Sequence, residues 1–411
     1  MTYFPLTQAQ QEWQQRIADI ADREVAPHAD AVDKHRQFPK ASLQALQRAG
    51  LWGLRVAKEH GGLGADLVTT CVIVEEIAKR CPSTAMCYKM HLEASEVICR
   101  MPTLHQVQHI VAPMARGEVF ATVAGSESWG SGDNWTSSRS FSAVHKVDGG
   151  YYLDGIRKSY VTSAGEATHH FFICRIGEEA EPGQLSLLFV ERDHIQWDIL
   201  EPWDGLGLRG NGSAPVRFRG FVPQENRIGN EHTAMRDASQ MFPPVMGLTY
   251  AAAYLGIGSG AYAIACQEGN RRFASGSRRL DVPMNQRRMA ELSAQIEAAQ
   301  TMLHAVAAMF DAGHLPSMVP VMQAKVLCSE TAVHATQELM TMFGGTAFAG
   351  RLPLERYFRD ARAGLIMALA NDAAYHDSAT MLYRAEAPRG EARLRSRFTA
   401  ALTACVVLYC T

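Results

Sequence analysis

Two glycine-rich stretches carry hydroxyl and aromatic side chains that could hold a cofactor. The first contains Ser126 and Gly132, and the second contains Tyr160 and Thr162. Backbone N–H groups in glycine-rich turns are free to bind anionic groups such as phosphate. Neither stretch identifies a site alone, because Ser126 could cap a turn and Tyr160 could pack in a core.

Two further features lie in the second half of the chain. Gly344-Gly345 forms another glycine turn, and Arg272, next to Arg271, follows a run of small residues that reads as a helix. A cation is favoured at a helix C-terminus, so this position already has a structural explanation.

The charged side chains near the glycine-rich run 205–213 and in the Arg-Asp-Ala-Arg motif have structural interpretations. Arg209 could brace its own turn. Arg359 and Asp360 could form a structural ion pair.

The composition excludes several classes of protein. The chain has 411 residues, of which 47% are hydrophobic and 20% charged, with a net charge of −2. This is ordinary globular composition, and it lacks the basic excess that nucleic acids or anionic membranes attract. No apolar run approaches the roughly 18 residues that a membrane span needs.

The cysteines bear on the cell compartment. Nine are dispersed along the chain without any Cys-x-x-Cys pair. We therefore expect reduced thiols, no metal site and, because the first residues lack a secretory signal pattern, a cytoplasmic protein.

Three blocks of different periodicity must position the candidate residues. Residues 1–118 read as helical, and residues 119–232 as a β domain in which Asp148-Gly149-Gly150 predicts a hairpin. Residues 233–385 return to helix, with an apolar stripe from Met289 to Phe310 that steps by three and four. The blocks suggest one composite unit, because no flexible linker separates them. Residues 386–411 form a basic and then apolar tail that we do not assign.

The motifs in this order resemble those of the acyl-CoA dehydrogenase superfamily, a family of flavoproteins, over roughly residues 5–380. The resemblance rests on runs 124–133, 155–165 and 205–213, on Phe343-Gly344-Gly345 and on Arg359-Asp360-Ala361-Arg362. It implies an α+β fold with an N-terminal helical domain, a middle β-barrel domain and a C-terminal four-helix bundle. It also implies FAD, or reduced FMN or FAD as a co-substrate.

The same resemblance implies roles for individual residues. Tyr160 would pack against the flavin ring, Thr162 would bond near its reactive nitrogen, and Ser126 would face it. Gly132 stands where many relatives have Ser, and its backbone would contact phosphate. Arg272 and Gly344-Gly345 would reach the FAD of a neighbouring subunit, so we expect a dimer or tetramer.

The chain departs from the family pattern at the catalytic base. Counting on from Ala361, the position of the usual glutamate is Ala368, and the helix from Met246 to Gln267, which holds the base in some members, has no carboxylate. An alanine cannot abstract a proton. Asp372 lies one helical turn beyond Ala368 and could partly substitute. The other polar groups near the presumed pocket, each with a structural interpretation as well, are His91, Asn371 and His376.

Three functions remain open from the sequence. The first is a FAD-dependent oxidoreductase acting on a CoA-bound or carrier-bound acyl group without the usual glutamate. The second is a monooxygenase that uses reduced flavin and O₂ to hydroxylate nitrogen, sulfur or carbon. The third is a flavin-binding subunit without chemistry of its own. An electron-transfer flavoprotein or a flavin reductase would be the redox partner of the first two.

Overall fold

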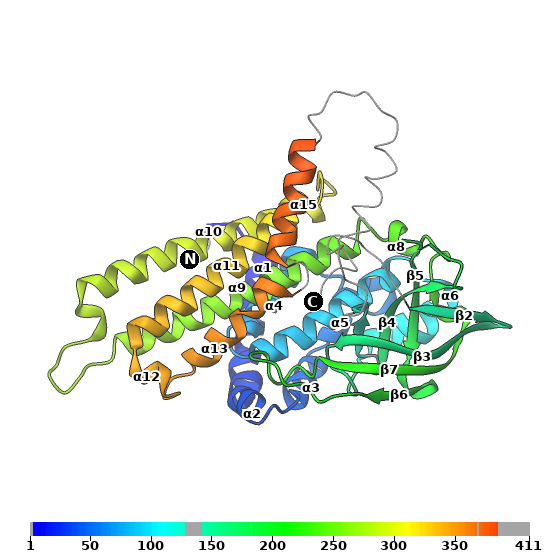
Figure 1. Ribbon diagram of the computed structural model, residues 1–411. Coiled ribbons are helices and arrows are strands. Elements are labelled where there is room, and N and C mark those ends of the chain that lie inside the picture. The colour runs from blue at the N-terminus through cyan, green and yellow to red at the C-terminus, as the bar shows by residue number, and fades with distance from the viewer. Residues whose placement is uncertain (1–2, 128–141, 182, 368–369, 385–411) are drawn as a thin grey trace.

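A computed structural model describes residues 3–127, 142–181, 183–367 and 370–384. Gly132, Ala368 and the tail from residue 385 lie outside these ranges. Figure 1 shows a helical N-terminal part, a sheet at one end of the molecule, and long C-terminal helices that extend away from it. None of the described helices is long and apolar enough to cross a lipid bilayer.

The N-terminal part is helical, as predicted, but its first long segment is interrupted. Thr7 caps the first helix through a reciprocal pair of hydrogen bonds with Gln10. A π turn and a 3₁₀ turn containing Pro27 then separate the first two helices, since proline has no N–H to continue the ladder. The helices are α1 (Gln8–Ile20), α2 (Ala29–Lys34), α3 (Lys40–Arg48), α4 (Leu67–Ala78), α5 (Pro82–Arg100), α6 (Leu104–Gln106) and α7 (Ala112–Ala115).

The middle part is a mixed eight-stranded sheet in the order β6-β7-β3-β2-β4-β5-β8, with β1 also paired to β4. The predicted hairpin at Asp148-Gly149 joins β2 to β3, with Val147 opposite Gly150. The strands are β1 (Ala121–Ala124), β2 (Ala143–Val147), β3 (Gly150–Val161), β4 (His169–Ile176), β5 (Ser186–Glu191), β6 (Gln196–Ile199), β7 (Ala214–Pro223) and β8 (Arg227–Ile228).

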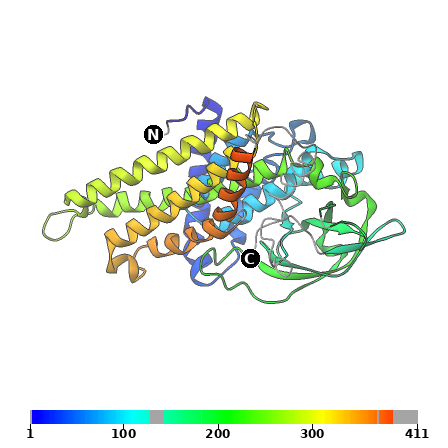
Figure 2. The ribbon, with the colours of Figure 1, turned by 45° about the horizontal axis from the view of Figure 1, so that its top comes forward.

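Strand β4 separates two cores because successive side chains of a strand point to opposite faces. Phe171 and Ile173 join the large helical core. Phe172 and Cys174 join a smaller core, to which β1, β2, β3, β5 and β7 also contribute. One face of the sheet therefore packs on the helices and the other encloses a small apolar core. Figure 2 shows the curvature of the strands.

The C-terminal part is a bundle built around α9 (Phe242–Gly269), whose small residues let other helices approach closely. A Cβ atom on Gly256 would lie 2.5 Å from the carbonyl oxygen of Glu75 in α4, and one on Gly260 would lie 2.5 Å from that of Lys79, just after α4. The remaining helices are α8 (Ala234–Asp237), α10 (Pro283–Asp311), α11 (Val319–Phe343), α12 (Gly345–Phe348), α13 (Leu354–Ala361), α14 (Ala363–Ile366) and α15 (Asn371–Arg384). Helix α10 buries the predicted stripe that includes Met289, Leu292 and Leu303.

Candidate active site

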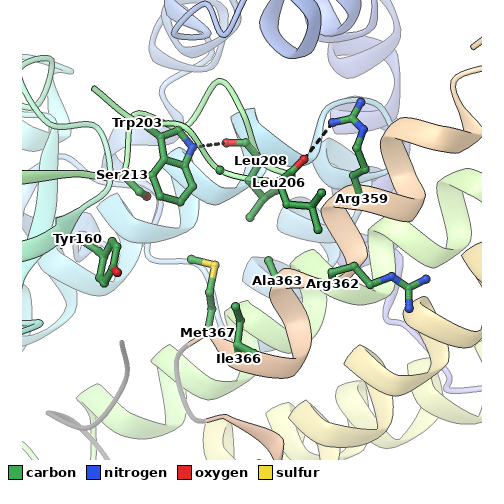
Figure 3. A pocket seen from close by; sticks show the side chains of 12 residues that line it. Tyr160, Trp203, Leu206, Leu208, Ser213, Arg359, Arg362, Ala363, Ile366 and Met367 are labelled. Carbon is green, nitrogen blue, oxygen red and sulfur yellow. Dashed lines mark hydrogen bonds between the residues drawn. The ribbon is translucent and has the colours of Figure 1, made fainter. Parts of the chain in front are cut away.

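A pocket of about 300 Å³ lies between the sheet and the C-terminal helices (Figure 3). Tyr160 of β3 borders it on one side, the loop between β6 and β7 forms another wall, and α13 and α14 close the opposite side. Leu206 and Ile366 are 63% and 61% exposed, so they mark the mouth. Such a concave, largely apolar pocket is typical of a site for a small molecule or cofactor.

The guanidinium groups of the two arginines on the helical side are bound by partners within the protein. Arg359 donates to Asp33, with nitrogen–oxygen distances of 2.6 and 2.9 Å. Arg362 donates to the carbonyl oxygen of Val333 at 3.3 Å, and Figure 3 shows its guanidinium turned outward. Arg359 also donates to the carbonyl oxygen of Leu206 in the pocket wall at 3.3 Å, as Figure 3 shows. Both guanidinium groups therefore already have hydrogen-bond partners, and most of the remaining lining is apolar.

Ser126 fixes the backbone of Tyr160 at the edge of the pocket. The Ser126 hydroxyl donates to the carbonyl oxygen of Tyr160 and accepts from its N–H, both at 3.1 Å. The Tyr160 side chain is 40% exposed and borders the pocket. The two motifs identified in the sequence therefore meet at this point, and Tyr160 is available to a ligand.

Thr162 lies behind the pocket rather than in its lining. Its side chain is buried, and its hydroxyl is 2.7 Å from that of Ser213, which does line the pocket. Thr122 donates to the Thr162 carbonyl oxygen at 2.6 Å. Ser213 was not singled out from the sequence, although it closes the glycine-rich run 205–213.

A buried ion pair joins the same two motifs. The Lys158 ammonium donates to the Glu127 carboxylate, and both side chains are almost inaccessible to solvent. Lys158 also donates to the Ile173 carbonyl oxygen at 2.7 Å, and Glu127 accepts from the N–H of Ser142 at 3.1 Å. Because breaking a buried pair is costly, this contact ties β3 firmly to the segment that follows β1.

The glycine-rich loop is held against α13 by a backbone contact. Asp360 accepts from the N–H of Leu208 at 2.6 Å, and a Cβ atom on Gly207 would lie 2.5 Å from the Arg359 carbonyl oxygen. Burial raises the pKa of the Asp360 carboxyl to about 7. The prediction of an ion pair between Arg359 and Asp360 is wrong, because Arg359 pairs with Asp33 and Glu355 instead.

Comparisons with known proteins agree with this arrangement. Three family models match: the acyl-CoA dehydrogenase N-terminal domain at residues 7–118, the middle domain at 122–221 and the C-terminal domain at 245–370. The chain belongs to the acyl-CoA dehydrogenase family. It is therefore an oxidoreductase of a flavin-dependent family, with FAD or FMN as the cofactor.

Individual relatives are similar along most of their length. The short-chain-specific acyl-CoA dehydrogenase of Clostridium acetobutylicum is 27% identical over 364 residues, covering 87% of this chain and 94% of that protein. The 3-sulfinopropanoyl-CoA desulfinase of Paraburkholderia xenovorans is 26% identical over 364 residues, covering 87% and 92%. The structure of butyryl-CoA dehydrogenase from Megasphaera elsdenii aligns with a TM-score of 0.84 at 22% identity, covering 92% and 99%.

The pocket has features that fit a flavin ring. Tyr160 offers an aromatic face, Ser213 a hydroxyl and the loop at Gly205 and Gly207 accessible backbone beside an apolar cavity. Of the residues that the family resemblance assigns to the flavin, Ser126, Tyr160 and Thr162 lie together here. Gly132 lies outside the described residues.

Of the other polar residues proposed near the pocket, His91 is held by structural hydrogen bonds, and Asp372 and His376 lie on α15. Both ring nitrogens of His91 are engaged, Nδ1 by the N–H of Ala121 at 3.0 Å and Nε2 with the Trp52 carbonyl oxygen at 2.8 Å. Burial lowers the pKa of His91 to about 4. Asp372 and His376 are exposed on α15.

Asn371 contributes to the support beneath the pocket. The buried Lys325 ammonium donates to the Gly364 carbonyl oxygen at 2.8 Å and to the Asn371 side chain at 2.7 Å. It thereby links the two sides of the segment that contains Ala368, which lies outside the described residues.

Arg272 and Gly344-Gly345 are not among the residues that line this pocket. Figure 1 places α12 and the loop between α9 and α10 at the tip of the bundle, away from the sheet. Arg279 joins these two features by donating to the Met342 carbonyl oxygen at 2.9 Å. Their contact with a flavin requires a second subunit and stays a prediction.

Proposed function

We propose that this chain binds flavin in the pocket beside Tyr160 and Ser213. The ring would pack on Tyr160, and the backbone bonds of Ser126 would hold that strand in place. Thr162 would act through the hydroxyl of Ser213, to which it is hydrogen-bonded at 2.7 Å. The bound flavin would supply the redox chemistry.

We further propose that the substrate is a CoA-bound or carrier-bound acyl thioester, processed without a glutamate at the usual position. The observation that carries this proposal is the absence of a carboxylate from the sequence at both familiar base positions, Ala368 and the helix from Met246 to Gln267. General-base catalysis contributes roughly 10²–10⁴-fold, so loss of the base makes simple α,β-desaturation slow. The desulfinase relative carries a name for a reaction other than dehydrogenation.

A monooxygenase that uses reduced flavin and O₂ is the second candidate. The largely apolar lining of the pocket, in which Arg359 and Arg362 already have hydrogen-bond partners, favours it because such chemistry needs a dry site. A flavin-binding subunit without its own chemistry would share the fold. For the oxidoreductase the partner would be an electron-transfer flavoprotein, and for the monooxygenase a flavin reductase.

The absorbance spectrum of the purified protein, followed by addition of reduced flavin in air, tests these alternatives. A yellow protein that retains flavin, and whose flavin is bleached by an acyl thioester in the absence of air, supports the thioester oxidoreductase. A colourless protein that consumes O₂ and forms hydroxylated product with reduced flavin supports the monooxygenase. A protein that binds flavin but changes neither signal supports the non-catalytic subunit.

Light scattering addresses assembly. We propose a dimer or tetramer in which Arg272 and Gly344-Gly345 of one subunit contact the flavin of another. A monomer with full flavin occupancy would contradict this assembly.

A further inference from the structure

An exposed pair of histidines lies on α6 and on the π-helical turn that follows it. His105 belongs to α6 (Leu104–Gln106), and His109 belongs to the π turn Val107–Val111. Both side chains are exposed, and their ring centroids are 4.3 Å apart with 32° between the ring planes. Within the described ranges of the chain, neither ring has a hydrogen bond or an ion pair. The ring nitrogens are therefore available to a ligand from solvent.

The backbone beneath the two rings is fixed by inward-facing neighbours. Thr103 and Gln106 form a reciprocal pair of cap hydrogen bonds at the start of α6. The buried Gln106 side chain also donates to two backbone carbonyl oxygens in the segment 225–227, both at 2.8 Å. Ile110 is buried in the helical core. Because each histidine directly precedes one of these anchors, the spacing of the two rings is set by the fold and needs no ligand to create it.

The spacing of the histidines suits chelation of a metal ion. Residues four apart share one face of a helix, and two histidines at this spacing bind zinc in the His-Glu-x-x-His motif. A zinc–nitrogen bond is about 2.0–2.1 Å long, so two nitrogens on one ion lie roughly 3 Å apart. Rings whose centroids are 4.3 Å apart reach that separation by a small rotation of their side chains.

The residue between the histidines decides what such a site can do. The His-Glu-x-x-His motif uses its glutamate as a general base, whereas this chain has Gln106 there. An amide cannot take up a proton in this role, and the Gln106 side chain is already hydrogen-bonded to the backbone. The pair therefore fits a metal-binding role and not a hydrolytic one.

We propose that His105 and His109 chelate one divalent transition-metal ion, each through one imidazole nitrogen. Imidazole ligands suit Zn²⁺, Cu²⁺ and Ni²⁺, whereas Mg²⁺ and Ca²⁺ need oxygen ligands. Among the residues that the structure describes, no group of three or more His, Cys, Asp or Glu is placed to hold a metal, so water fills the other positions of the ion.

This site goes beyond the proposed flavin function. Neither histidine lines the pocket beside Tyr160, and Figure 1 shows α6 at the sheet end of the molecule. The expectation of no metal site was based on the dispersed cysteines, and the histidine pair is independent of them.

The test is calorimetric titration of the full-length, flavin-loaded protein, purified without a histidine tag, with NiCl₂. Nickel is the probe because it binds imidazole well and, unlike Cu²⁺, is not reduced by thiols. We expect one strong Ni²⁺ site per chain. His105→Gln and His109→Gln should each weaken it at least tenfold, because the second imidazole otherwise binds intramolecularly at a high effective concentration.

A matched control removes two other exposed histidines. His28 and His35 are seven residues apart, which is about 10 Å along a helix and too far to share one ion. His28→Gln/His35→Gln should therefore keep the Ni²⁺ affinity of the wild type. The proposal is overturned if the wild type has no strong Ni²⁺ site, if either single variant binds as tightly as the wild type, or if the control variant loses affinity as much as they do.

Discussion

Replacing Thr162 with valine tests whether this residue acts on the flavin through Ser213. The substitution keeps the branched shape and removes one hydroxyl from a 2.7 Å hydrogen bond between two buried side chains. A typical hydrogen bond contributes about 0.5–1.5 kcal/mol, so we expect flavin affinity to fall by about 2- to 10-fold. The loss should stay in this range because the Ser213 hydroxyl borders the pocket and can find another partner there.

A double-mutant cycle with Ser213→Ala decides the route. Flavin dissociation constants are measured by fluorescence titration for the wild type, both single variants and the double variant. If Thr162 acts through Ser213, the double variant should be no weaker than Ser213→Ala, with a coupling energy of about 0.5–1.5 kcal/mol. Additive losses would refute the reasoning and would show that Thr162 contacts the flavin independently. Thr301→Val, which removes a hydroxyl bonded within α10, serves as a control and should leave flavin affinity unchanged.

Three further changes test other parts of the site. Because the folded-state pKa of Asp360 is raised to about 7, the folded protein binds more protons than the unfolded chain between about pH 4 and 7, and stability falls as pH rises through this window. Asp360→Asn keeps an oxygen acceptor for the N–H of Leu208 and should flatten this pH dependence of the unfolding free energy, measured by urea denaturation. An unchanged pH dependence in the variant would contradict the assignment. Lys325→Met removes a donor from the Gly364 carbonyl oxygen and one of the two donors, with Ser329, of the Asn371 side-chain oxygen. We therefore expect a loss of about 1–3 kcal/mol in unfolding free energy and faster proteolysis near residue 368. Wild-type behaviour would rule out the support that we assign to Lys325. Arg272→Glu should lower flavin affinity at least tenfold in the oligomer while leaving the melting temperature of the flavin-free protein unchanged, and undiminished affinity would exclude the contact between subunits.

Much of the fold could be predicted from local sequence. The Asp148-Gly149-Gly150 turn is a local signal, and its hairpin is confirmed by the pairing of Val147 with Gly150. The apolar stripe of α10 is likewise set by the period of one helix. The break between α1 and α2 was harder to predict, because a π turn leaves no distinct pattern in the sequence.

The contacts that build the site could not be predicted because they join distant parts of the chain. Thr162 and Ser213 are 51 positions apart, and only the pairing of β3 with β7 brings them together. Arg359 and Asp360 are neighbours in sequence, yet successive residues of a helix point in different directions. Arg359 consequently pairs with Asp33 on α2, and Asp360 meets the loop at Leu208.

The central claim is that this flavoenzyme does not desaturate simple acyl thioesters at a useful rate. It is tested most directly by anaerobic rapid mixing of the flavin-loaded protein with butyryl-, octanoyl- and isovaleryl-CoA, while the flavin absorbance is followed. We expect slow bleaching or none, and faster bleaching in an Ala368→Glu variant, which restores a carboxylate at the familiar position. Rapid bleaching by the wild-type protein would contradict the claim and would point to another base, with Asp372 the first to be replaced.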